Sequence, residues 1–110
     1  MPVWYQVRDL EVARSFYRDT LGLTEDSVDE SGGWARLRRG EMEIVVALGE
    51  PEEAGVAVVD VEDIKAEAER LRAANVEVGV VLELHGQMRL LDVYDPDGNR
   101  VQLAQELSSG

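Results

Sequence analysis

The side chains best suited to chemistry are few in this chain. There is no cysteine, which excludes thiolate catalysis and zinc sites built on cysteine. His85 is the single histidine, and no nucleophile pattern accompanies it. None of the serines stands in the glycine-flanked pattern of a nucleophile elbow. The remaining acid–base candidates are carboxylates, of which Glu43 and Asp92 alternate with core residues on predicted strands. The sequence therefore assigns no catalytic residue.

The charge balance narrows the classes of partner. The 110 residues carry 23 acidic and 11 basic side chains, a net charge of −12. This excess disfavours nucleic acids and anionic membranes and favours cationic partners. No apolar run approaches the roughly 18 residues that a membrane span needs, and the chain starts without a signal-like segment. We therefore expect a cytoplasmic protein that binds neither nucleic acid nor membrane.

A tight turn at 95–98 organises the second half of the chain. Proline presets φ there, and Gly98 accepts a positive φ. The flanking runs 89–94 and 100–104 are rich in strand formers, which predicts a hairpin. Val101 and Leu103 alternate with polar neighbours on the outgoing strand. The polar face therefore looks into whatever space the sheet encloses.

The elements before this hairpin repeat one pattern. The first half is predicted to form a strand, a helix and three strands, at 3–8, 10–21, 24–30, 34–38 and 42–48. The second half is predicted to form a strand, a helix, a strand broken at Gly79 and the hairpin, at 55–59, 64–74, 76–84, 89–94 and 100–104. Each half thus has the order β-α-β-β-β.

Both halves begin their helix in the same way. Val-Arg-Asp-Leu at 7–10 matches Val-Glu-Asp-Ile at 61–64, 54 residues later, which indicates an internal duplication. We expect one α+β domain made of module one (1–49), an acidic linker, module two (55–105) and a tail (106–110). One helix covers only one face of each sheet. The opposite faces are expected to meet each other, or a partner chain, around a cleft.

These motifs resemble the vicinal oxygen chelate superfamily, which includes glyoxalase I, extradiol dioxygenases and bleomycin-resistance proteins. The matching pieces follow the family's order along nearly the whole chain. They are Val-Arg-Asp-Leu-Glu at 7–11, Ser-Phe-Tyr at 15–17, Leu-Gly-Leu at 21–23, the second helix and its exit at 66–76, and Asp-Pro-Asp-Gly-Asn at 95–99. The resemblance implies the paired-module fold with its cleft.

The resemblance also implies where metal-using members place their four ligands. In this chain those positions hold Pro2, Val56, Gln102 and Val45, or Glu43 if the strand register shifts. Divalent metals prefer several imidazole and carboxylate ligands together, and this set has no histidine and at most one carboxylate. We therefore expect no metal and no cofactor. The resemblance then points to the metal-free branch, whose best-known members bind and sequester antibiotics, often as dimers.

The candidate ligand-binding residues are those on predicted cleft faces. They are Trp4, Gln6, Trp34, Arg36, Val56, Val58, Leu90, Asp92 and Gln102. The tryptophans could stack on a ligand or pack in a dimer interface. Arg36 could orient an anionic group or remain solvated. Asp92 could pair with a cationic ligand, or with Arg89 or Arg100 nearby.

Three functions remain open at this point. The first is a metal-free small-molecule-binding homodimer that sequesters a planar, neutral or cationic organic compound. The second is a lyase- or isomerase-like enzyme that uses Glu43, Asp92 or His85 for acid–base work. The third is a non-catalytic accessory dimer whose cleft is closed by packing.

Overall fold

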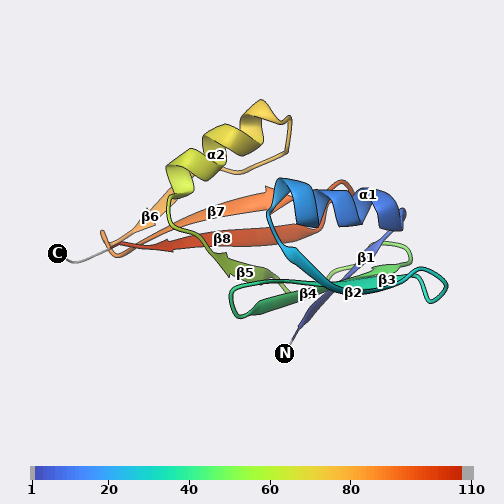
Figure 1. Cartoon of the computed structure of the whole chain (residues 1–110). Coiled ribbons are helices and arrows are strands. Elements are labelled where there is room, and N and C mark those ends of the chain that lie inside the picture. The colour runs from blue at the N-terminus through green and yellow to red at the C-terminus, as the bar shows by residue number, and fades with distance from the viewer. Residues whose placement is uncertain (1, 108–110) are drawn as a thin grey trace.

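Alternating apolar residues build two four-stranded mixed sheets in the computed structural model, which describes residues 2–107 (Figure 1). The strands of the first sheet are β1 (Val3–Val7), β2 (Thr24–Asp29), β3 (Trp34–Arg39) and β4 (Met42–Leu48), and their order across the sheet is β1-β4-β3-β2. β1 pairs with β4 in parallel, and the other neighbours are antiparallel.

The second sheet repeats this topology. Its strands are β5 (Ala57–Asp60), β6 (Leu82–Leu84), β7 (Met88–Tyr94) and β8 (Arg100–Glu106), in the order β5-β8-β7-β6. β5 again pairs in parallel with the last strand of its unit. The predicted α+β fold of two β-α-β-β-β units is confirmed. β8 ends at Glu106, and residues 108–110 of the predicted tail lie outside the described residues.

The two helices begin with the same cap. The side chain of Asp9 accepts a hydrogen bond from the backbone nitrogen of Val12 at 3.1 Å before α1 (Leu10–Ser15). Asp63 does the same for Ala66, also at 3.1 Å, before α2 (Ile64–Ala73). A short side-chain oxygen at this position satisfies an amide that the helix leaves unpaired. The repeated Asp is therefore the local reason for the repeated helix start.

Three details differ from the sequence-based expectations. The first helix widens into a π-helical turn, η1 (Phe16–Thr20), before Gly22 ends it at φ 77°. The helical spacing of Ile64, Ala68 and Leu71 also predicts a core position for Ala74, which is exposed. The long strand at 76–84 is reduced to β6 and an isolated bridge between Val78 and Val93. Leu82 lies four positions after Val78, whereas their partners on β7 are three positions apart, so one extra residue bulges out and breaks the pairing.

A network of polar side chains joins the two units at the hairpin turn. The phenol of Tyr5 donates to the carbonyl of Arg100 and accepts from the amide of Ala57 at 2.9 Å. Asn99 donates through its side chain to the carbonyl of Gln6 at 3.0 Å. Burial raises the pKa of the Tyr5 phenol, which therefore stays protonated as a donor. The turn thus holds β1 against the second unit.

Both helices lie on the same side of the sheets (Figure 1). α1 contacts β3 and β4, and α2 contacts β7 and β8. The molecule is elongated, 49 × 27 × 24 Å. The faces turned away from the helices have no covering element within the described chain, and we call them the open faces. No helix within residues 2–107 is long and apolar enough to cross a bilayer.

Candidate functional site

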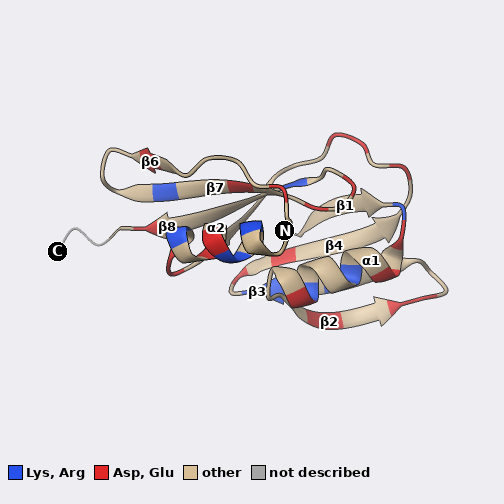
Figure 2. Ribbon diagram, turned by 90° about the horizontal axis from the view of Figure 1, so that it is seen from above, with Lys and Arg blue, Asp and Glu red and all other residues tan. Residues whose placement is uncertain are grey.

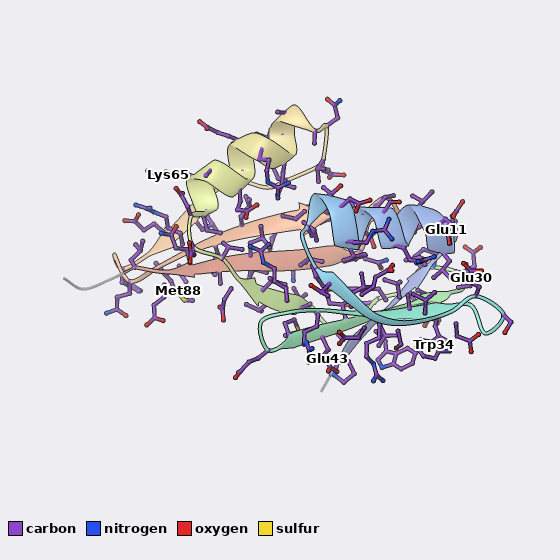
Figure 3. The ribbon with its side chains drawn as sticks, viewed as in Figure 1. Glu11, Glu30, Trp34, Glu43, Lys65 and Met88 are labelled. Carbon is purple, nitrogen blue, oxygen red and sulfur yellow. The ribbon has the colours of Figure 1, made fainter. Side chains whose placement is uncertain are left out.

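The open face of the first sheet carries both tryptophans. Trp4 pairs in register with Val45, and Val45 with Arg36 on the next strand. Two residues further along β1 and β4, Gln6 pairs with Ala47, and Ala47 pairs with Trp34 on β3. Trp4 is 56% exposed and is the largest exposed apolar side chain among the described residues. Figure 3 shows Trp34 below the sheet, on the side away from the helices. This face therefore presents aromatic surface to solvent.

The open face of the second sheet carries the remaining candidates. Val58, Gln102 and Asp92 form one row across three strands. Leu90 lies one level further along, paired with Ala104 and Leu82. Asp92 is already engaged, because Gln102 donates to it at 3.2 Å and Arg100 approaches it at 3.5 Å. Its carboxylate is therefore shared among protein donors, which reduces its capacity to hold a cationic ligand.

The structure does not gather these residues into one pocket of a single chain. Trp4 and Gln6 line a hollow of about 580 Å³, which we call the front hollow. Val56 lines a hollow of about 250 Å³, the back hollow, together with Gly98, Asn99 and Arg100. Val58 lines a separate hollow of about 180 Å³. The other five candidates are not among the lining residues of these three: Trp34, Arg36, Leu90, Asp92 and Gln102.

The acidic linker contributes residues that sequence reasoning left out. Glu52 and Glu53 line both the front and the back hollow, as do Ala54 and Gly55. Tyr5 also lines both, although strand alternation places it on the face opposite Trp4 and Gln6. The run of glutamates is visible in the sequence, but its place beside Trp4 depends on how the chain returns between the two units. No local signal could have found it.

A hollow larger than these three lies elsewhere. It measures about 680 Å³ and is formed between the N-terminal half of α2 and the turn joining β3 to β4. Arg39, the last residue of β3, approaches Glu67 of α2 at 3.5 Å, and Arg70 binds the same carboxylate at 2.6 Å. None of the candidate residues lines this hollow. This hollow therefore lies where the first unit contacts α2.

The acid–base candidates stand apart from one another. Glu43 lies on β4, on the same open face as Val45, and Figure 3 shows it below the first sheet. His85 is exposed in the turn between β6 and β7, where its φ of 52° lies in the left-handed region. Asp92 lies in the middle of the second sheet, in register with Gln102. Acid–base catalysis needs its groups within hydrogen-bond reach of one substrate, and a single chain does not bring these three together.

The positions implied for metal ligands offer little donor chemistry. Pro2 and Val56 have no side-chain donor atom, and the amide of Gln102 donates to Asp92. Val45 is buried and apolar, which leaves Glu43 as the one carboxylate that the implied ligand positions could supply. Within residues 2–107, no three His, Cys, Asp or Glu side chains lie together in a way that could hold a metal ion. These residues do not fit a divalent metal, which prefers several imidazole and carboxylate ligands.

A second apolar patch lies at the far end of the second sheet. Val80, Leu82 and Leu84 are 73%, 52% and 42% exposed. Leu90 pairs in register with Leu82, and Met88 with Leu84. Figure 3 shows Met88 on the same side of the sheets as Trp34. An apolar row of this length on a small protein indicates an interaction surface. Each open face therefore carries one apolar patch.

The sequence model of one protein family, the Glyoxalase/Bleomycin resistance protein/Dioxygenase superfamily, matches residues 2–103 of this chain. The chain therefore belongs to this superfamily. No curated protein matches the sequence.

Solved structures share the fold. An integron cassette protein from the mobile metagenome of the Halifax Harbour sewage outfall has a TM-score of 0.83 at 22% identity, covering 96% of each chain. The fosfomycin resistance protein FosX of Listeria monocytogenes has a TM-score of 0.78 at 16% identity, covering 96% of this chain and 90% of its own. A bleomycin resistance determinant encoded on the transposon Tn5 has a TM-score of 0.74 at 17% identity, covering 96% of each chain.

Proposed function

We propose that this chain is a metal-free binding protein of the glyoxalase and bleomycin-resistance type, which sequesters a planar, neutral or cationic organic compound in the cytoplasm. The observation that carries the proposal is the exposed ring of Trp4 at the wall of the front hollow. A hollow of about 580 Å³ lies within the range of small-molecule sites. An indole face with one side open favours stacking on a flat ring.

The chemistry of the donor positions supports binding without a metal. Pro2, Val56 and Gln102 stand where the metal-using relatives are expected to carry ligands, and they supply no anionic donor. Recognition would then rest on apolar and aromatic contacts with a few polar groups, among them the amide of Gln6. Purified protein should hold no stoichiometric zinc, nickel, manganese or iron. Stoichiometric metal in elemental analysis after desalting would contradict this part of the proposal.

The charge distribution supports the choice of ligand class. Acidic residues, red in Figure 2, occur in both units, and the net charge is −12. Glu52 and Glu53 stand at the hollow that contains Trp4, and Asp92 is balanced by its own protein partners. Such a field attracts cations over long range and repels anions such as phosphates. The ligand is therefore expected to be neutral or positively charged.

We further propose a homodimer in which the open faces pack together. Trp34 on one copy would pack against the patch around Leu82 and Leu84 on the other, and the reverse, while the ring of Trp4 would keep one face toward the front hollow. One two-fold axis allows both contacts at once, because a twofold interface uses the same surfaces on each copy. The remaining candidates, such as Arg36 and Gln102, would then line a cleft shared by two chains. A chain of 110 residues benefits from the additional buried surface.

The test is a binding titration with three matched flat molecules: N-methylacridinium, acridine and an acridine carboxylate. In Trp34→Phe protein, emission from Trp4 should be quenched by the cation and the neutral ring, and much less by the carboxylate. Calorimetry should show that Trp4→Leu weakens binding by about 0.5 to 1.5 kcal/mol, the contribution of an aromatic pair. Val12→Ala, which changes an exposed apolar residue on α1, is the matched control and should leave the affinity unchanged.

Two outcomes would contradict the proposal. Quenching by the carboxylate alone, abolished by Arg36→Ala, would indicate a site for an anionic substrate. No response to any of the three, with both tryptophans buried between subunits, would favour the accessory dimer.

A further inference from the structure

The linker between the two units forms a thin partition. We call residues 50–56 the strap. Residues 52–55 line the front hollow on one side and the back hollow on the other, and Tyr5 lines both. The two spaces, about 580 and 250 Å³, are therefore separated by this one piece of chain. Where the strap lies decides whether Trp4 faces a shallow hollow or a deeper one.

One side chain holds the strap in place. The amide of Gln6 on β1 faces two acceptors, the carboxylate of Glu52 at 3.2 Å and the carbonyl oxygen of Glu50, and the amide orientation that satisfies both has its nitrogen as the donor. Gly49 leaves room for this amide, because a Cβ there would lie 3.0 Å from it. The side chain of Gln6 therefore occupies a defined position against the strap. The same side chain lines the front hollow, where a ligand would compete for its donor.

The rest of the strap is weakly attached. Among the described residues, positions 51–55 take part in no hydrogen bond other than the one from Gln6 to Glu52. The strap is anchored at one end by the ion pair of Arg8 and Glu50 at 3.4 Å, where both side chains are exposed and the contribution is small. At the other end the amide of Ala57 donates to the phenol of Tyr5. A segment fixed at its ends and at one central contact can move as a unit.

We propose that the strap is a gate controlled by Gln6. Seated on Gln6, it keeps the two hollows apart. Released, it lifts and joins them into one space floored by Tyr5. A ligand that takes the amide of Gln6 breaks the contact with Glu52, so its binding and the opening of the gate occur together. The role of the gate rests on the binding function proposed above, but its movement can be measured on the protein without ligand.

The experiment uses the absence of cysteine. Ala54→Cys in the Trp34→Phe protein gives a single thiol on the strap, which is labelled with bimane, a fluorophore that tryptophan quenches on contact. Bimane should be dim, because Ala54 and Trp4 line the same hollow. Gln6→Glu keeps the side-chain size, removes the donor and places a second carboxylate against Glu52. Loss of a hydrogen bond to a charged group should raise the ratio of released to seated strap roughly tenfold, and bimane emission should rise with it.

The control makes the same charge change elsewhere. Gln105→Glu keeps an oxygen that can accept from the amide of Ile64, as Gln105 does at 3.0 Å, and it should leave bimane dim. Glu52→Ala removes the same contact by changing an exposed residue of the strap, which does not put folding at risk. It should raise bimane emission as Gln6→Glu does. Bright bimane before either change, or unchanged emission after both, would overturn the gate. If none of the acridines binds but the bimane response is as expected, the proposed binding function is refuted and the movement of the strap still stands.

Discussion

At the scale of the residue, the buried carboxylate of Asp95 requires hydrogen-bond donors from several parts of the protein. It accepts from the phenol of Tyr17 at 2.8 Å, from the side chain of Asn99 at 2.9 Å, and from two backbone amides of its own turn. Tyr17→Phe removes one of these donors and should lower the free energy of unfolding by about 1 to 3 kcal/mol, because a buried charged acceptor loses a partner. Urea denaturation at neutral pH measures this, and Tyr94→Phe, on a half-buried ring, is the matched control.

The same contact makes stability depend on alkaline pH. Burial, followed by the charge of Asp95, raises the pKa of the Tyr17 phenol well above its ordinary value. A group whose pKa is raised by folding stabilises the folded state below its unfolded pKa, which is about 10, and this contribution falls as the pH rises further. In Tyr17→Phe, the decline above that pH should be shallower by up to about 1.4 kcal/mol per pH unit. An equally steep decline in both proteins would show that Tyr17 is not the group concerned.

At the scale of the element, the hairpin turn depends on one backbone angle. Gly98 has a φ of 85°, and a Cβ added there would meet no atom within 4 Å. Gly98→Ala therefore tests the angle without crowding, and it should cost about 1 to 2 kcal/mol, because L-residues are strained in this region. Thermal or urea unfolding gives the value. Gly55→Ala is the control, since Gly55 also has open space and does not have a positive φ in that range. Equal stability of the two variants would mean that the turn does not require glycine.

At the scale of the whole molecule, the open faces predict association. If Leu82 packs against a second copy, Leu82→Glu buries a carboxylate without a partner and should weaken the dimer by about 3 to 5 kcal/mol. Sedimentation equilibrium measures the change in the dissociation constant. Val12→Glu adds the same charge to an apolar residue on the helix side that is 48% exposed, and it should leave the dimer intact. A parent protein that stays monomeric at high concentration would refute the proposed interface.

The sequence by itself determined the features that rest on local rules. The alternation of Val101 and Leu103 identified a core face, and both side chains are buried. The sequence predicted a cap at Asp9 before the first helix and at Glu62 or Asp63 before the second, and Asp9 and Asp63 form the caps. The turn before Asn99 predicted a hairpin, which is the pairing of β7 with β8. These features depend on residues a few positions apart, where chain geometry leaves few alternatives.

The tertiary structure alone decided which distant residues meet. The side chain of Asn99 reaches the carbonyl of Gln6, 93 positions away, and Gln6 in turn holds the strap through Glu52. The acidic linker looked like solvated chain, yet its place between two hollows follows from the return path of the backbone between the units. Local patterns say nothing of such contacts, because they arise from how two sheets pack. That packing is set by the summed burial of a core that spans both units.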